Sequence, residues 1–528
     1  LIGSGPGAVV VTSRHRLTGL DASAHLTLPP LAEAEQHQLL AAICGPERLA
    51  EERAATEQIL TACAGLPLAL RIVGARLAHG GRTVPATADR LRRAGDRLGA
   101  LTLDHLDVRG VFLMSYRSLS GSPRPAERAA AEAFRRLGLW PHPVSGAATA
   151  ALLGQPMGQT LDLLDILVNA HLLQNPAPDV YRFHDLLGEF AAECAEREDD
   201  EDEQRACRLR ILEWYHAALH RANTPTGPRP HADPAPLSDA PLPEFAGPGE
   251  ALAWTSAHLA AIHHAVKTAA EIRPQLSWQI ANCLFTWTTT NWGVAGEWEQ
   301  PFHDALAAAE RVGDLKGQAR MQNMLGVAHG CSFRNETSLV YFRTAAALYE
   351  QLGVPERQAQ VLANYGTACG QAGRVEEGLK AMRRAIELRG PAAAPTASFL
   401  HPLGTLLLAA GDAAAAEAVF RQCLKISRAD GQVLHEGISL VTLGDSLRAL
   451  DRREEAVACI EESLRIYRRL GNDFHTADGL EALARTHFHF GDHEQARDTW
   501  NQALAIARDH RIERVREDCL KGLAALDS

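Results

Sequence analysis

The segment Tyr181-Arg182-Phe183-His184-Asp185-Leu186-Leu187 divides this chain into two kinds of sequence. Its first half alternates as a strand does, and its second half begins a helical pattern. Short apolar motifs lie before it, and a regular repeat follows it. A His-Asp pair at such a junction could contact a phosphate. The alternative is that Asp185 caps a helix beginning at Leu186, while His184 is an ordinary surface residue.

The second half of the chain is periodic. A small residue recurs in steps of 40, 40, 38, 40 and 40 residues, at Thr286, Gly326, Gly366, Gly404, Gly444 and Ala484. Two further registers follow 12 and 19 positions later, at Trp298, Ser338, Gly378, Ala416, Ala456 and Ala496, and at Ala305, Ala345, Ala385, Cys423, Ser463 and Ala503. Turn residues follow seven positions after most of the first set, at Gly293, Gly373, Gly411, Asp451 and Gly491, whereas Phe333 breaks the pattern.

This periodicity predicts stacked helical hairpins. Two helices approach closely only where facing side chains are small, and one hairpin cannot bury its apolar face alone, so neighbouring hairpins supply the missing surface. The pattern resembles tetratricopeptide repeats, with five clear repeats and a degenerate one at Trp278 to Gly313. The resemblance implies a surface that binds other molecules, and it does not identify them.

Composition excludes several classes of protein. The chain has 528 residues and a net charge of −11, which argues against holding DNA or an anionic membrane as its main task. No apolar run is long enough to span a bilayer. The ten cysteines show no CxxC spacing, so we expect reduced thiols in a cytoplasmic protein. We expect no metal, because His487, His489 and His493 lack a further ligand near them.

Two motifs stand out in the amino-terminal third. Ala8 to Thr12 is a short β-branched run, typical of a buried strand, and Arg14 and Arg16 follow at its carboxyl end, where open α/β sheets bind ligands. Either arginine could contact a phosphate, and the alternative is that both are solvated loop charges. The second motif is Gly65-Leu66-Pro67. It predicts that one helix ends at Gly65 and another begins with Pro67 in its first turn.

In order and spacing, these two motifs and the His-Asp segment resemble the NB-ARC module of STAND-class nucleotide switches. The sequences of the motifs are most similar to those of actinobacterial SARP-type regulators, which also carry tetratricopeptide repeats. The resemblance implies that Arg14 approaches the terminal phosphate, Pro67 packs near adenine, and His184 contacts the β-phosphate of ADP. Gly65 and Asp185 would support Pro67 and His184. Phe183 departs conservatively from the methionine or valine of the family.

One part of such a module is absent from this chain. A phosphate-binding loop ends in Gly-Lys-Ser or Gly-Lys-Thr, and no Gly-Lys dipeptide occurs here. We therefore expect no ATPase activity and weak or absent ADP/ATP binding by the chain alone. Because the chain begins with Leu1 and not with methionine, we expect it to be a piece of a longer polypeptide that carries the loop upstream.

The predicted fold is mainly α in four parts. Residues 1–104 would be a remnant α/β nucleotide-binding subdomain with helices, 105–198 a winged helix, 199–250 an acidic and Pro-rich linker, and 251–528 a solenoid of about six repeats. Asp162 and Asp165 lie in the predicted second helix of the winged helix, where a DNA reader would carry Arg, Asn or Ser. DNA binding would thus need a domain that this chain does not contain.

The resemblance favours the ADP-binding, regulatory portion of a STAND-type signalling or transcriptional regulator. Its array would sense a protein partner or effector on its concave face, self-association being a further use of that surface. The alternative is a scaffold that binds no nucleotide and only docks protein partners. A free-standing catalyst has no support, since no nucleophile–base pair stands out. No membrane association is expected.

Overall fold

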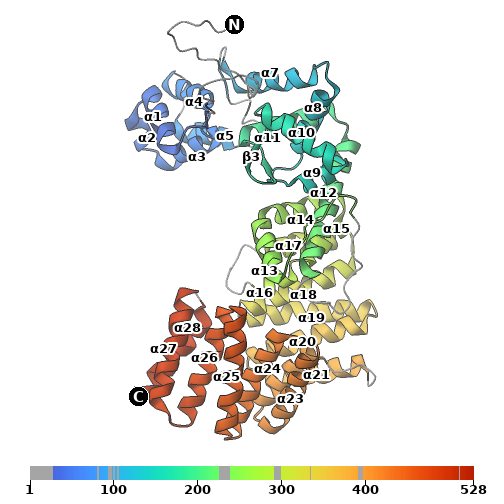
Figure 1. Cartoon of the computed structure of the whole chain (residues 1–528), viewed down its shortest axis with the longest axis vertical. Coiled ribbons are helices and arrows are strands. Elements are labelled where there is room, and N and C mark those ends of the chain that lie inside the picture. Colours follow the sequence, from blue (N-terminus) through green and yellow to red (C-terminus); the bar gives the residue numbers. More distant parts are fainter. Residues whose placement is uncertain are drawn as a thin grey trace, which may run out of the picture. The chain divides into compact units, whose positions relative to one another are not determined.

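The chain folds as two compact units, Leu1–Ile272 and Arg273–Ser528, shown in Figure 1. The computed structural model describes residues 26, 28–79, 83–92, 98, 101–103, 106–224, 238–290, 299–332, 334–390, 396–510 and 512–527. The predicted strand at residues 8–12, with Arg14, lies outside these residues, as do Trp298, Gly293 and Phe333.

The first unit begins with a group of short helices and a two-residue ladder. These elements are α1 (Glu33–Cys44), α2 (Pro46–Ala50), α3 (Arg53–Cys63), α4 (Pro67–His79), α5 (Val84–Arg92), β1 (Thr102–Leu103) and β2 (Leu106–Asp107). Leu40, Ile59 and Leu70 are fully buried between the helices. Because α1 and α4 pack together, the Gly-Leu-Pro corner before α4 is held against the segment that precedes α1.

Helices and a β-hairpin follow in the same unit: α7 (Val108–Ser120), α8 (Pro125–Leu137), α9 (Gly146–Leu153), α10 (Met157–Asn169), β3 (Gln174–Ala177), β4 (Val180–Arg182) and α11 (Asp185–Glu198). Strand β4 pairs antiparallel with β3, and Tyr181 also bridges to Val144. Phe134 and Phe190 are fully buried, with ring centroids 6.1 Å apart, and form the aromatic centre of this part.

The region 199–250 differs from the predicted linker. Residues 201–223 form a long helix, α12 (Glu201–Asn223), on which Trp214 and Tyr215 are buried. The acidic run begins this helix: Asp200 accepts a hydrogen bond from the Glu203 backbone N–H at 2.7 Å, and the following acidic side chains lie where the helix dipole favours negative charge. The acidic part of the predicted linker is therefore the start of a helix.

The boundary of the array also differs. Helices α13 (Pro248–Ala257) and α14 (Leu259–Ile272) belong to the first unit and pack on α12. Trp254 contacts Trp214 with ring centroids 6.5 Å apart. Residues 251–272, which the sequence pattern assigns to the array, are therefore held by the aromatic side chains of α12.

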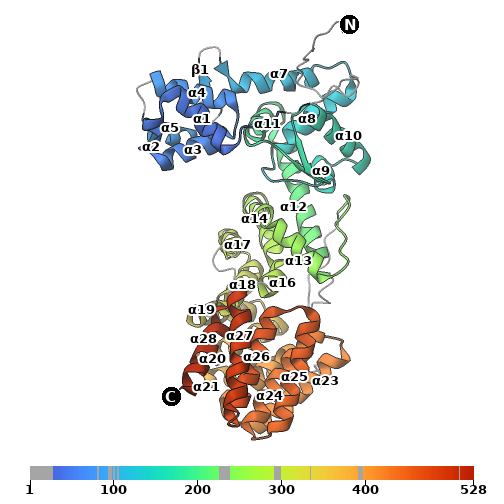
Figure 2. The ribbon, with the colours of Figure 1, turned by 60° about the vertical axis from the view of Figure 1, so that its left-hand side comes forward.

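The second unit is an array of helical hairpins, clearest from α18 onward in Figures 1 and 2. Its helices are α15 (Pro274–Asn282), α16 (Phe285–Thr290), α17 (Gln300–Arg311), α18 (Leu315–Cys331), α19 (Asn335–Gln351), α20 (Pro355–Gln371), α21 (Val375–Arg389), α22 (Ala397–Ala409), α23 (Ala413–Ala429), α24 (Val433–Ala449), α25 (Arg453–Leu470), α26 (Asp473–His489), α27 (His493–Asp509) and α28 (Glu513–Leu526). Consecutive helices from α17 to α28 contact each other throughout, which confirms the predicted stacking.

The recurring small residues lie where paired helices touch. A Cβ on Gly404 would come within 2.7 Å of the Phe420 ring, and one on Gly444 within 2.6 Å of Ile460 Cγ1. The predicted turns also occur: Gly411 has φ of +85°, and Asp451 has φ of 57°. The close approach of paired helices thus explains why the first set of recurring residues is small. The left-handed backbone of the turns explains the turn residues that follow seven positions later.

Candidate functional site

The Gly-Leu-Pro corner is a tight connection between α3 and α4. Helix α3 ends at Cys63, two residues before the predicted end, and Ala64 and Gly65 are both left-handed, with φ of 51° and +71°. The Gly65 carbonyl accepts a hydrogen bond from Leu31 N–H at 2.9 Å. A Cβ on Gly65 would lie 2.9 Å from the Leu31 oxygen, so both the backbone conformation and the close approach require glycine.

The His-Asp segment connects β4 to α11. His184 occupies the N-cap position, with φ of −70° and ψ of 138°, and its carbonyl accepts from the backbone N–H groups of Leu187 and Gly188. The helix begins at Asp185, so the expectation that Asp185 caps a helix beginning at Leu186 is wrong. Asp185 is exposed in the first turn, where the helix dipole stabilises its negative charge.

The structure brings these two motifs together. The Nε2 atom of His184 lies 2.8 Å from the carbonyl oxygen of Ala64, a residue 120 positions earlier in the chain. Because a carbonyl only accepts hydrogen bonds, Nε2 carries a proton and donates it. His184 is half-buried, so it is not the ordinary surface residue of the alternative interpretation.

The other predicted site residues are placed less directly. Pro67 is the first residue of α4 and is exposed, three positions along the chain from Ala64. Arg14 lies outside the described residues. The described part of the candidate site therefore consists of the Ala64–Pro67 corner and the start of α11.

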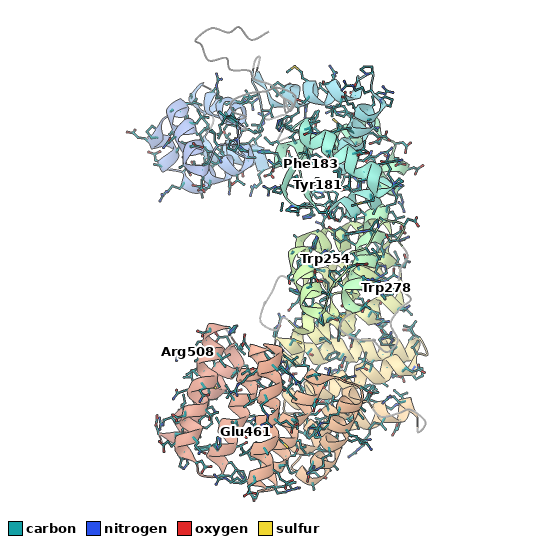
Figure 3. All side chains as sticks on the ribbon, viewed as in Figure 1. Tyr181, Phe183, Trp254, Trp278, Glu461 and Arg508 are labelled. Atoms are coloured by element: carbon teal, nitrogen blue, oxygen red, sulfur yellow. The ribbon has the colours of Figure 1, made fainter. Side chains whose placement is uncertain are left out.

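Aromatic packing holds His184 in place. Phe183 meets Phe134 edge to face, with ring centroids 5.4 Å apart. Figure 3 marks Phe183 and Tyr181 on this segment. Burial, together with the negative charge of Asp179, raises the pKa of Tyr181. The phenylalanine before His-Asp is thus half-buried against the core ring of Phe134, and it fixes the backbone from which His184 reaches Ala64.

An ionic cluster at the far end of α11 escaped the sequence analysis. Arg135 Nε lies 2.9 Å from Asp199 Oδ1, and their side chains are only 16% and 4% exposed. The Tyr116 hydroxyl donates to Glu198 at 2.5 Å, and burial together with this bond raises its pKa. These contacts fasten the end of α11 to α7 and α8. The partners lie 64 and 82 positions apart, so no local pattern reveals them.

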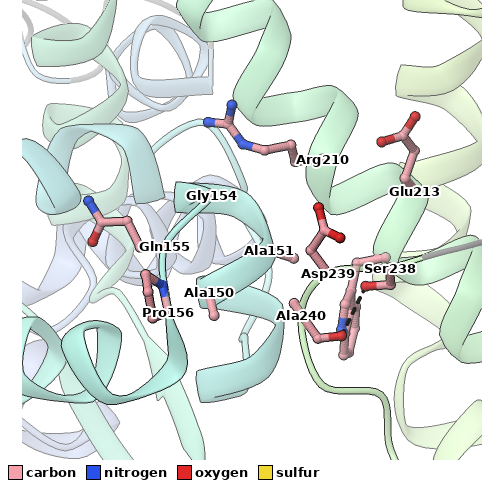
Figure 4. A pocket seen from close by; sticks show the side chains of 11 residues that line it. Ala150, Ala151, Gly154, Gln155, Pro156, Arg210, Glu213, Ser238, Asp239 and Ala240 are labelled. Atoms are coloured by element: carbon pink, nitrogen blue, oxygen red, sulfur yellow. Dashed lines mark hydrogen bonds between the residues drawn. The ribbon is translucent and has the colours of Figure 1, made fainter.

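A second feature of the first unit is an open cavity of about 500 Å³, shown in Figure 4. It lies between the end of α9, α12 and the segment 238–240. Among the described residues that line it, Arg210 is the one basic side chain, and its Nε donates to the Leu152 carbonyl at 3.1 Å. Glu213 and Asp239 also line it, so the cavity is acidic on balance and does not suit a nucleotide phosphate.

Comparison with known proteins identifies the repeats. Residues 397–430 and 436–509 match two family models of the tetratricopeptide repeat. The predicted carboxy-terminal tetratricopeptide solenoid is therefore confirmed. None of the helices in the described ranges combines the length and apolar character needed to cross a membrane.

The chain is also similar to regulatory proteins over most of its length. It is 30% identical to the regulatory protein AfsR of Streptomyces griseus over 550 residues, which cover 95% of this chain and 54% of that protein. It is 41% identical to the AfsR of Streptomyces coelicolor over 217 residues, or 40% of this chain and 21% of the relative. The chain thus spans about half the length of the first of these relatives.

A solved structure of a similar protein supports this fold. A STAND protein (signal transduction ATPase with numerous domains) with a tetratricopeptide repeat sensor, from Pyrococcus horikoshii, matches with a TM-score of 0.55 and 14% identity. The match covers 94% of this chain and 63% of that protein. It supports a mainly α fold, consistent with the predicted class.

Proposed function

Starting from its similarity to the AfsR regulatory proteins, we propose that this chain is the regulatory portion of a STAND-type signalling or transcriptional regulator. A bound adenine nucleotide would hold one conformation of the first unit. The repeat array of the second unit would receive a protein partner or effector. The observation that carries this proposal is the contact of His184 with Ala64, which unites two motifs of the resemblance.

Some of the described residues suit a nucleoside diphosphate. His184 holds an N–H donor at a half-buried position, and such a donor suits a phosphate oxygen. Pro67 leaves its ring exposed, which suits packing against a base. No Gly-Lys sequence is present to cradle the phosphates. We therefore assign His184, Pro67 and, by resemblance, Arg14 to the nucleotide, and we expect weak binding without an upstream loop.

The single proton on His184 Nε2 supplies a mechanism. It is donated to Ala64 in this structure, and a phosphate oxygen would compete with that carbonyl for it. A nucleotide that engages His184 would change how firmly the start of α11 holds the corner before α4. Differential binding of this kind shifts a population between two conformations.

We do not assign DNA contact to this chain. Helices α8, α9 and α10 followed by the β3–β4 hairpin, with the bridge from Tyr181 to Val144, support the interpretation of residues 105–198 as a winged helix. On α10, however, Asp162 and Asp165 are exposed, and their charge repels a phosphate backbone. Regulation of transcription would require a DNA-binding domain elsewhere in the full protein.

The test is nucleotide binding by the purified chain and by a longer form that includes upstream residues. Released nucleotide is identified after denaturation, and ADP is titrated by calorimetry. We expect the longer form to bind ADP, His184→Ala to weaken binding by about tenfold or more, and His220→Ala on α12 to leave it unchanged. Equal ADP binding by His184→Ala and the unsubstituted protein would remove His184 from the nucleotide site.

The scaffold function remains the second candidate, because the tetratricopeptide repeats provide binding surface and no Gly-Lys dipeptide occurs in this sequence. It predicts that neither form binds ADP and that partner binding does not respond to nucleotide. Nucleotide-dependent partner binding by the longer form would exclude it.

A further inference from the structure

Three potential metal ligands meet at the start of the second unit. Glu299 occupies the N-cap position of α17, His303 lies one turn further along that helix, and His329 lies near the end of α18. One ligand atom from each residue lies within 4.8 Å of those from the other two. The side chains of Glu299 and His329 are only 11% and 8% exposed.

From this arrangement we propose that Glu299, His303 and His329 bind a divalent cation of the zinc class. Two imidazoles and one carboxylate form a ligand set that zinc accepts, with a further position left for water. The cation would join the start of α17 to the end of α18 and so stabilise the hairpin they form. This role is independent of nucleotide binding, since these helices belong to the second unit.

The surroundings of His329 hold its imidazole at the cluster. Its Nδ1 is buried without a hydrogen-bond partner among the described residues. Tyr341 of α19 stacks on the ring, with centroids 5.1 Å apart and planes 6° from parallel. This stacking restricts rotation of the imidazole and presents it to the cluster.

Arg334 provides the competing interaction. Its guanidinium forms an ion pair with Glu299. A cation at the cluster would compete with Arg334 for the same carboxylate, so metal binding would loosen Arg334, the residue at the N-cap position of α19. Arg334 and a bound cation would therefore exclude each other at the Glu299 carboxylate.

An ion pair between Arg334 and the nearly buried Glu299, with two histidines near it, is the competing explanation of the same geometry. The two explanations differ in the effect of removing Arg334. If the cluster is only an ion pair, Arg334→Met leaves an uncompensated carboxylate and creates no affinity for metal. If it is a cation site, the same substitution frees a ligand and strengthens metal binding.

The experiment uses the full chain after removal of metal by dialysis against a chelator. Zn²⁺ affinity is measured by competition with a coloured chelator, and Co²⁺ is added to read the coordination from its visible spectrum. We expect one equivalent to bind. His303→Ala and His329→Ala should each weaken binding by more than about 100-fold, because loss of even an outer partner of a ligand costs 10–100-fold. Arg334→Met should strengthen it.

Matched variants keep the test interpretable. Glu299→Gln preserves shape, and circular dichroism checks that each variant is folded. His37→Ala serves as the control, because Glu33, His37 and Glu57 form a similar cluster with both carboxylates exposed. The proposal is overturned if the unsubstituted chain binds no Zn²⁺, if only His37→Ala reduces binding, or if Arg334→Met leaves the affinity unchanged.

Discussion

The Nε2 atom of His184 donates a hydrogen bond to the carbonyl oxygen of Ala64 over 2.8 Å. The acceptor lies in a corner that is left-handed at both Ala64 and Gly65, and the donor lies at the N-cap position of α11. One side chain therefore ties the helices before residue 92 to the part that contains the β3–β4 hairpin. This contact determines how a nucleotide near His184 could alter the first unit.

Removal of this contact should loosen the corner locally. His184→Ala deletes one hydrogen bond, worth about 1 kcal/mol, so we expect severalfold faster amide exchange at the start of α4. Hydrogen exchange with mass spectrometry measures this directly. Exchange in the second unit serves as the internal reference and should not change. Unchanged exchange around residues 64–70 would show that the contact does not hold the corner.

Substitution of Gly65 should destabilise the first unit strongly. An alanine at position 65 would have to adopt the left-handed backbone conformation, which costs about 1–2 kcal/mol for a residue with a Cβ. Its Cβ would also lie 2.9 Å from both Leu31 O and Pro30 Cβ. Gly45→Ala is the matched control, because Gly45 also has a positive φ, of +89°, but a Cβ added there would have no atom within 4 Å. Thermal unfolding should show the larger loss for Gly65→Ala, and equal losses would contradict the importance of the close approach.

The buried pair of Arg135 and Asp199 should matter more than an exposed pair. Arg135→Ala leaves Asp199, whose side chain is 4% exposed, without its nearest cation, and loss of one partner of a buried pair costs about 3–5 kcal/mol. Arg384→Ala removes a pair with side chains 54% and 63% exposed, and we expect a change below about 0.5 kcal/mol. Chemical denaturation of both variants measures the loss in the free energy of unfolding. Equal losses would contradict the prediction and would mean that Arg136 takes the place of Arg135 beside Asp199.

Acid should destabilise the array partly through His401. Burial, and then the charge of His435, lower the pKa of His401 to about 4 in the folded chain, against 6.5 ordinarily. A lowered folded pKa means that the unfolded chain binds the proton first. The contribution of His401 to stability is therefore complete above pH 6.5 and is lost as the pH falls toward 4.

The variant His401→Leu tests this expectation, since leucine fills similar space and does not titrate. Melting temperatures at about pH 7.5 and pH 5 should differ less for this variant than for the unsubstituted chain. His37→Leu, at a more exposed site, should leave the difference as it was. A variant that loses as much stability in acid as the unsubstituted chain would exclude His401 as a source of the pH dependence.

Local patterns predicted the array better than the candidate site. Gly404 and Gly444 recur in register because each touches a residue of the next helix in its own hairpin, such as Phe420 or Ile460. The end of α3 and the start of α11 were predicted to within two residues, because both depend on short-range backbone signals. A run of acidic side chains looks alike at a helix end and in a solvated loop, so the sequence alone left both interpretations open for the start of α12.

The amino-acid sequence by itself determined the mainly helical class, the tetratricopeptide hairpins and the position of the His-Asp segment, because each depends on contacts between residues close in the chain. The tertiary structure alone decided that His184 meets Ala64, that Arg135 pairs with Asp199, and that His329 joins Glu299 and His303. These partners come from different helices, and their separations follow no period. Only folding of the chain brings such residues within bonding distance, so no spacing in the sequence encodes them.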